Sequence, residues 1–259
     1  MQRILSEVII LRMILILLLV MFHAFAPFAG AWADIPRMED VPSYYWIAKA
    51  SYSFMLESFV FISGYVIAHQ VQTRGKTILK LSTIVAGKAK RLLLPSIVFS
   101  IVYYFMFYDI EAPITSIVYK IINGCGHMWF LPMLFWCFIF LAVVEKCGLA
   151  LKWKLALVVL LTFMHVLPFP LRVNSALQYF LFFYVGYQIK QHDQFLTRHL
   201  LNRVILVGLP VFLIAFISTN CLFDSDTAMF AEKNSLDTKH PFRSHLTLIG
   251  DNMVAKIFQ

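Results

Sequence analysis

Long apolar runs, separated by short polar segments, dominate the chain. A helix of roughly 20 mainly apolar residues crosses a bilayer core, and seven segments approach that length. These segments are 8–27, 44–69, 92–108, 127–145, 153–168, 175–189 and 203–222. The sixth is the weakest because it is short and carries Gln178 and Gly186. The pattern predicts an all-α fold, a polytopic integral membrane helix bundle with about seven spans.

Basic residues gather in alternate segments between the apolar runs. Segments 145–154 and 190–203 are net basic, whereas 28–43 and 109–126 hold more acidic than basic residues. Segment 70–91 has no acidic residue and six basic ones, Arg74, Lys76, Lys80, Lys88, Lys90 and Arg91. An excess of Lys and Arg marks cytoplasmic loops, so this alternation predicts a cytoplasmic N-terminus.

Composition supports a membrane protein and excludes other classes. The chain has 259 residues, of which 60% are hydrophobic and 14% charged, and its mean hydropathy is +0.76. Soluble domains carry roughly 25% charged residues, so a soluble, disordered or nucleic-acid-binding protein is excluded. The net charge of +8 is therefore assigned to cytoplasmic loops. The four cysteines have no metal-ligand spacing, and we expect them to be small buried residues rather than disulfide or reactive sites.

The two ends of the chain differ from the middle. Residues 1–33 resemble a secretory signal that ends at Ala31-Trp32-Ala33, but Arg12 interrupts the apolar run and further spans follow, which favours a retained first span. From residue 223 the sequence becomes polar. We therefore divide the chain into a membrane domain, 1–222, and a polar C-terminal tail, 223–259, which is either a small extracytoplasmic segment or an early end.

Two ionisable residues, Arg12 and His23, lie within the first apolar run. Such residues are costly inside a membrane and commonly mark function. Eleven residues at 100° each make three turns plus about 20°, so both project from one helical face, roughly 16 Å apart. Arginine can hold an anionic group and histidine can act as a general base. The alternative is that Arg12 extends to the interface and His23 makes a structural hydrogen bond.

Four segments occur in the order and spacing of a known family. They are Arg12-x10-His23, the stretch Phe61-Ile62-Ser63-Gly64-Tyr65-Val66-Ile67, the basic stretch 88–95 that ends at Pro95, and His127-Met128-Trp129-Phe130-Leu131-Pro132. Together they resemble the membrane acyltransferase-3 family, whose members acylate surface glycans. The resemblance covers about residues 3–220.

The resemblance implies an integral membrane O-acyltransferase, multi-pass in the bacterial inner (plasma) membrane. It would move an acyl group from cytoplasmic acyl-CoA to a hydroxyl of a surface or lipid-linked carbohydrate, and the expected acyl group is acetyl. We expect neither a metal nor a nucleic acid to take part. His23 and Arg12 would be catalytic, and Arg12 would also bind acyl-CoA together with Lys88, Lys90 and Arg91. His127 and Trp129 would line the acceptor entrance.

Each of these assignments has a simpler alternative. Positive-inside anchoring explains the basic stretch, an aromatic belt explains Trp129, and helix packing explains Ser63-Gly64. Glu57 matches no family motif; we include it on the substrate side as the only acid well inside a predicted span.

Other functions also stay open. A transporter or flippase would use intramembrane charges, but it predicts pseudo-symmetric halves that the sequence lacks. A membrane scaffold would tolerate loss of Arg12 and His23. Complete family members have more spans than this chain offers, so a truncated or inactive member is a further alternative.

Overall fold

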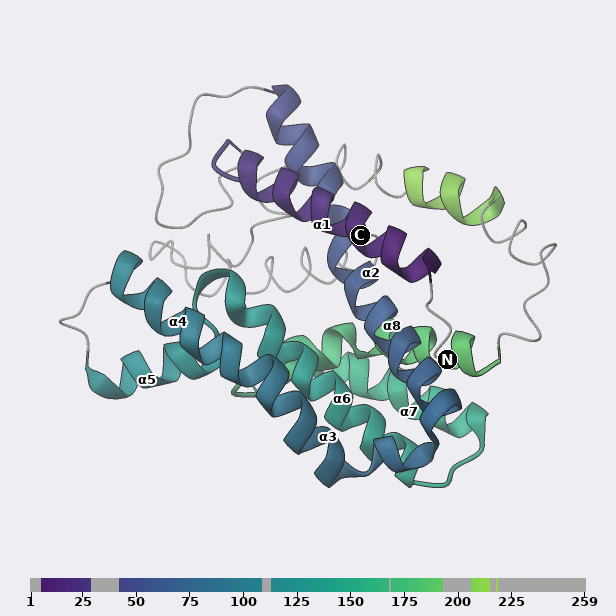
Figure 1. The fold of residues 1–259 in the computed structure, drawn as a ribbon. Helices are drawn as coiled ribbons and strands as arrows, with labels where there is room; N and C mark the ends of the chain where they lie inside the picture. Colours follow the sequence, from purple (N-terminus) through teal and green to yellow (C-terminus); the bar gives the residue numbers. More distant parts are fainter. Residues whose placement is uncertain are drawn as a thin grey trace. The chain divides into compact units, whose positions relative to one another are not determined.

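The described part of the chain is helical throughout its regular elements. The computed structural model describes residues 6–28, 42–108, 113–167, 169–192, 206–214 and 218, and every regular element in them is a helix or a helical turn (Figure 1). This confirms the all-α prediction. The described residues divide into two compact units, a larger one within 57–192 and a smaller one of residues 6–56 with 206–214 and 218.

The smaller unit is built on the pairing of α1 (Ser6–Phe25) with the first part of α2 (Pro42–Arg74). The ring centroids of Phe22 and Tyr52 lie 4.6 Å apart, and those of Phe25 and Tyr44 lie 5.0 Å apart. Because residue numbers rise on α1 as they fall on α2, the two helices run antiparallel. Most apolar side chains of α1 are exposed, as in Leu17 at 61%, which suits a helix that faces lipid.

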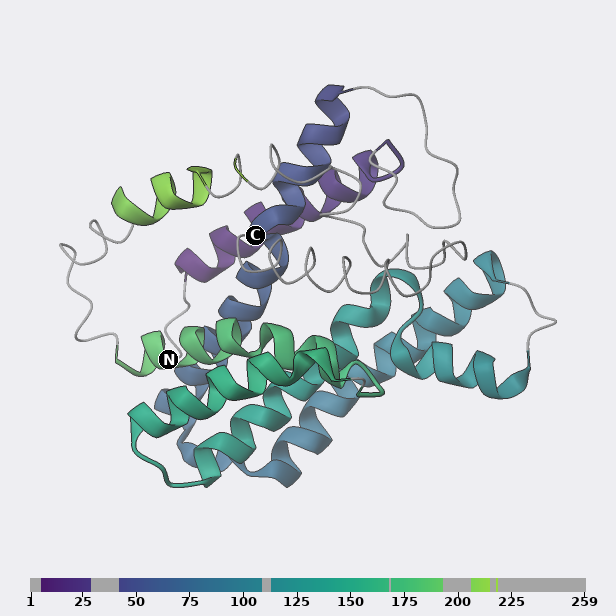
Figure 2. The same ribbon diagram turned by 180° about the vertical axis from the view of Figure 1, so that it is seen from behind.

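The larger unit holds the remainder of α2 and all elements up to residue 191. In chain order these are η1 (Lys76–Leu79), α3 (Leu81–Lys88), η2 (Ala89–Leu93), α4 (Leu94–Phe107), α5 (Ile114–Asn123), η3 (Gly126–Trp129), α6 (Phe130–Lys146), α7 (Leu151–Phe163), η4 (Met164–Val166) and α8 (Val173–Gln191). Helices α6, α7 and α8 lie side by side (Figures 1 and 2). Aromatic rings fill the α6–α8 interface, where Phe138 and Phe183 meet edge to face at 4.9 Å. Such pairs stabilise the interface beyond the area they bury.

A pair of glycines lets the backbones of α2 and α8 approach closely. A Cβ atom added to Gly64 would overlap the carbonyl oxygen of Phe183 and lie 2.9 Å from its carbonyl carbon. A Cβ atom added to Gly186 would in turn overlap the carbonyl oxygen of Phe61. Small residues commonly allow this packing in membrane helices. The packing interpretation of Ser63-Gly64 is therefore confirmed.

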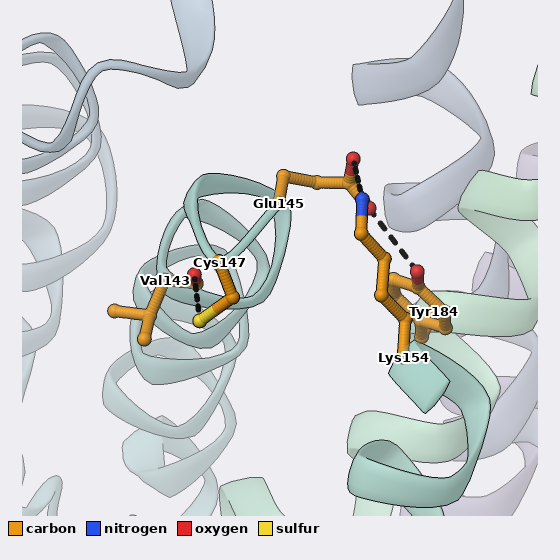
Figure 3. A network of polar contacts seen from close by, with 5 residues as sticks. All are labelled: Val143, Glu145, Cys147, Lys154 and Tyr184. Carbon is orange, nitrogen blue, oxygen red and sulfur yellow. Dashed lines mark hydrogen bonds and ion pairs between the residues drawn. The ribbon is translucent and has the colours of Figure 1, made fainter. Parts of the chain in front are cut away.

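A polar contact joins α6, α7 and α8 at one end of the larger unit (Figure 3). The ammonium of Lys154, in α7, donates to Glu145 Oε2 at 2.8 Å, and the Tyr184 hydroxyl of α8 donates to Glu145 Oε1 at 3.1 Å. Both partners of the ion pair are mostly buried, with side chains 14% and 19% exposed. One carboxylate in the last turn of α6 therefore ties down the start of α7 and the middle of α8.

Four helical runs in the described residues are long and apolar enough to cross a membrane. They are Val8–Phe25, Trp46–Arg74, Leu81–Phe107 and Gly126–Lys146, and they overlap the first four predicted spans. Helix α7 has 13 residues and is about 20 Å long, short of a bilayer core of about 30 Å. The segment 203–222 lies partly outside the described residues. The total of seven spans and the cytoplasmic N-terminus stay predictions.

One predicted boundary is wrong, and one helix was not predicted. The third run begins at Leu81, not at residue 92, so Lys88, Lys90 and Arg91 lie in a helix rather than in a loop. The helix passes Pro95 through the π-helical turn η2, in which the Leu94 N–H donates to the carbonyl of Ala89, five residues back. Proline has no N–H to donate, and the wider turn lets the helix continue. The segment 109–126 also contains a helix, α5, that the apolar pattern did not predict.

Candidate functional site

The predicted site residues are divided between the two units. Arg12 and His23 belong to the smaller unit, whereas Glu57 and the motif residues from 88 onwards belong to the larger one. Helix α1 runs unbroken from Ser6 to Phe25, so the predicted helical register of Arg12 and His23 holds. Arg12 is exposed and His23 is half-buried.

The His23 ring has a defined orientation. Its Nδ1 lies 2.7 Å from the carbonyl oxygen of Leu19, one turn earlier in α1. A carbonyl oxygen can only accept, so Nδ1 carries the proton and donates it, and the lone pair of the neutral ring is on Nε2. The Phe22 ring packs against the imidazole edge to face at 5.2 Å. The structural hydrogen bond of the alternative interpretation is thus present, and it leaves Nε2 as the nitrogen that bears the lone pair.

The same unit contains a buried lysine that the sequence pattern did not single out. Lys49, on α2, is 0% exposed, and its Nζ lies 6.0 Å from the ring centroid of Trp46. It lies between Tyr44 and Tyr52, whose partners on α1 flank His23. Lys49 is therefore level with His23 along the helix pair. A lysine inside the predicted span 44–69 was the available signal.

The basic stretch of the larger unit has two kinds of environment. The Lys88 ammonium lies over the ring of Phe138, 3.8 Å from its centroid, and so contributes to packing of α3 against α6. Lys90 and Arg91 lie in the π-helical turn and are exposed. Of the three, Lys90 and Arg91 are the ones with exposed side chains.

His127 and Trp129 belong to η3, the turn that leads into α6. The turn is held against α4, because Ser96 Oγ donates to the carbonyl of Met128 at 3.3 Å. The rings of Tyr103 and His127 are 6.1 Å apart, and the guanidinium carbon of Arg172 lies 5.9 Å from the Trp129 ring centroid. Both predicted residues are half-buried, so they lie at the rim of the larger unit's packed interior.

A cavity of about 400 Å³ adjoins this turn. It is lined by polar and aromatic side chains from the end of α4, from α5 and from the start of α8, among them Tyr108, Tyr119, Lys120, Asn123, Arg172 and Asn174. The neighbouring acids Asp109 and Glu111 lie outside the described residues. Burial raises the pKa of the Cys125 thiol, which also lines the cavity, and the charges of Lys120 and Arg172 act in the opposite direction. Both cations are therefore close enough to act on this cavity.

The remaining candidates have simple environments. Glu57 is half-buried on α2. His165 Nδ1 donates to the carbonyl of Thr162 at 2.6 Å, a structural role. Of the cysteines, Cys125 and Cys137 are buried thiols and Cys147 is an exposed thiol, while Cys221 lies outside the described residues. Within the ranges that the structure describes, no group of three His, Cys, Asp or Glu side chains could hold a metal ion.

Comparison with protein families identifies the class of protein. The acyltransferase-3 model, described as an acyltransferase domain, matches residues 5–239, a range that contains all four motif segments. The chain belongs to this family, and the resemblance is confirmed. Its apolar helices and its family make it an integral membrane protein with an acyltransferase domain. No curated protein and no solved structure matches the chain.

Proposed function

We propose that the protein is a membrane O-acyltransferase of the bacterial inner membrane that transfers an acyl group, acetyl in the first instance, from cytoplasmic acyl-CoA to a hydroxyl of a surface or lipid-linked carbohydrate. The observation that carries the proposal is the Nδ1–H hydrogen bond of His23, in a chain that belongs to the acyltransferase family. This bond leaves Nε2 as the basic atom of the imidazole.

In the direct route, His23 Nε2 removes the proton of the acceptor hydroxyl as its oxygen attacks the thioester carbonyl. The C–S bond breaks, an ester forms, and the CoA thiolate leaves and takes up a proton. In the second route, Nε2 attacks the thioester carbonyl first, the C–S bond breaks and the CoA thiolate leaves. The acyl group then passes from the imidazole to the hydroxyl oxygen, and the hydroxyl proton balances the one that the thiolate takes up. A short incubation with labelled acetyl-CoA but no acceptor separates the two, because only the second route leaves label on the protein.

Arg12 belongs to the donor side of this scheme. It lies three turns from His23 and nearer the N-terminus of α1, which the charge pattern predicts to be cytoplasmic. Its guanidinium can bind a phosphate group of CoA through two hydrogen bonds. The charge pattern predicts Lys88, Lys90 and Arg91 on the same side of the membrane, where they would add positive charge for the same donor.

The test compares two histidines that make the same kind of hydrogen bond. His23 bonds to the Leu19 carbonyl and His165 to the Thr162 carbonyl. In membranes incubated with labelled acetyl-CoA, we expect His23→Ala to lose at least about a hundredfold in transfer to glycan, the scale of a lost general base, and His165→Ala to keep it. Protein levels in the membrane should be similar. Normal transfer in His23→Ala, or equal loss in both variants, would contradict the proposal.

A further inference from the structure

The cavity beside η3 carries positive charge. Helices α4 and α5 lie side by side (Figures 1 and 2), and the start of α8 completes the lining. Lys120 and Arg172 are the charged side chains among the described lining residues, and both are basic. Lys120 Nζ lies over the ring of Tyr108, 4.7 Å from its centroid. One wall of the cavity therefore offers an ammonium stacked on an aromatic ring.

Arg172 is held in place from several directions. Its Nε–H donates to the carbonyl of Asn123 at 3.0 Å, across 49 residues of sequence. The preceding carbonyl, that of Leu171, accepts a hydrogen bond from Trp136 Nε1–H at 2.9 Å. Leu171 and Arg172 have φ angles of 57° and 60°, a left-handed conformation that non-glycine residues rarely adopt twice in succession. The guanidinium, with five N–H donors in a planar fork, is thus held at the N-terminus of α8.

Asn123 supplies a second, independent sign of a ligand. The residue is 9% exposed, and its side-chain Oδ1 accepts no hydrogen bond from any residue that the structure describes. Buried polar atoms almost always have a partner, because leaving one without a partner is costly. Asn123 lines the cavity, so a rotation of its side chain would bring this oxygen to a hydroxyl of a bound sugar.

We propose that this cavity binds an acidic saccharide, whose carboxylate or phosphate group meets Lys120 and Arg172 and whose hydroxyl donates to Asn123. A volume of about 400 Å³ is within the range of small-ligand sites, and Tyr108 and Tyr119 offer ring faces to the sugar. That this saccharide is the acceptor rests on the proposed function. The predicted orientation places segment 109–126 and the His23 end of α1 on the same, extracytoplasmic, side.

The test measures binding without acyl-CoA, so that it does not depend on transfer. Purified protein in nanodiscs of phosphatidylcholine is titrated with a glucuronate disaccharide, with glucose 1-phosphate and with the neutral glucose disaccharide. We expect the two acidic sugars to bind at least about tenfold more tightly than the neutral one, because each charged contact is worth this factor or more. Lys120→Gln should reduce acidic-sugar affinity about tenfold and leave neutral-sugar binding unchanged.

A matched control removes one positive charge elsewhere. Lys152, exposed in α7, does not line the cavity, and Lys152→Gln should bind like the wild type. Because Arg172 also supports the fold, Asn123→Asp serves as the second variant; it keeps the size of the side chain and should weaken acidic-sugar binding by charge repulsion. Equal binding of neutral and acidic sugars, or no effect of Lys120→Gln, would overturn the proposal.

Two further arms separate the alternatives. Nanodiscs that contain phosphatidylglycerol test whether the cavity binds a lipid headgroup as its anion. If the protein binds the headgroup and no longer binds the sugar, the saccharide assignment is overturned. Binding without any transfer would disprove the proposed function alone, and transfer to neutral glycans without acidic-sugar binding would disprove this inference alone.

Discussion

At the scale of single residues, His23 combines an observed structural contact with a proposed chemical role. The hydrogen bond from Nδ1 to Leu19 is local, since it spans one turn of α1. Its consequence is chemical, because it fixes the atom that bears the lone pair. The sequence left two interpretations open, a structural hydrogen bond and a general base, and the observed bond is compatible with both. The transfer assay that compares His23→Ala with His165→Ala tests whether His23 is also a base.

The Cys125 thiol offers a direct measurement of the charges around the cavity. Burial raises its pKa, and the positive charges of Lys120 and Arg172 lower it. Removing one cation should raise the pKa further and reduce the thiolate fraction at a given pH. In a background with Cys147→Ser and Cys221→Ser, we expect Lys120→Gln to slow iodoacetamide alkylation of Cys125 at pH 8 by about twofold, the scale of a screened charge pair.

In this experiment the rate should rise with pH in both proteins, and the Lys120→Gln profile should lie at higher pH. Lys152→Gln, which removes a charge outside the cavity, should leave the profile where it was. A Lys120→Gln protein that reacts faster than the parent would mean that Lys120 does not act on this thiol.

At the scale of helices, Gly64 and Gly186 let the backbones of α2 and α8 approach each other closely. The backbone carbonyls of Phe183 and Phe61 lie where added methyl groups would go, and a backbone group cannot turn aside as a side chain can. We expect Gly64→Ala and Gly186→Ala each to destabilise the protein by about 1–3 kcal/mol, the usual cost of overpacking. Thermal unfolding in detergent, followed by loss of the monomer peak on size-exclusion chromatography, measures the effect.

Gly87 provides the control for this pair. It is also a helical glycine, in α3, but a Cβ atom added there meets nothing within 4 Å. Gly87→Ala should be neutral or stabilising by up to about 1 kcal/mol, because alanine favours the helix. Similar melting curves for all three alanine variants would show that α2 and α8 do not pack through these glycines.

The helix boundaries show where local patterns stop being sufficient. The apolar pattern located the first four spans, but it ended the basic segment at residue 91, whereas the helix already begins at Leu81. Proline at position 95 suggested a start, since it fits the first turn of a helix. The π-helical turn Ala89–Leu93 lets the helix continue past the missing N–H of Pro95. An apolar pattern does not reveal a turn of this kind.

At the scale of the whole molecule, the predicted orientation can be tested by chemical labelling. Cys147 is exposed and lies in the segment 145–154 that is predicted to be cytoplasmic. Ile114 is 76% exposed at the start of α5, in the segment predicted to be extracytoplasmic. With all other cysteines replaced, a membrane-impermeant maleimide should label Ile114→Cys in intact cells and Cys147 only in inverted vesicles. The reverse result would require an extracytoplasmic N-terminus.

The sequence by itself determined what depends on local periodicity and composition. Apolar runs predicted helices and a membrane, because a bilayer core admits few other backbones. Eleven residues of spacing placed Arg12 and His23 on one face, and the motifs identified the family. These features need no contact between distant residues.

Only the tertiary structure decided which distant residues meet. Two features join separate helices: the close approach of α2 and α8 at Gly64 and Gly186, and the cavity that Lys120 shares with Arg172. Arg172 and Asn123 are 49 residues apart, and helical periodicity carries no information over that distance. Such contacts arise when side chains of different helices fill one another's gaps, and that depends on the packing of the entire unit.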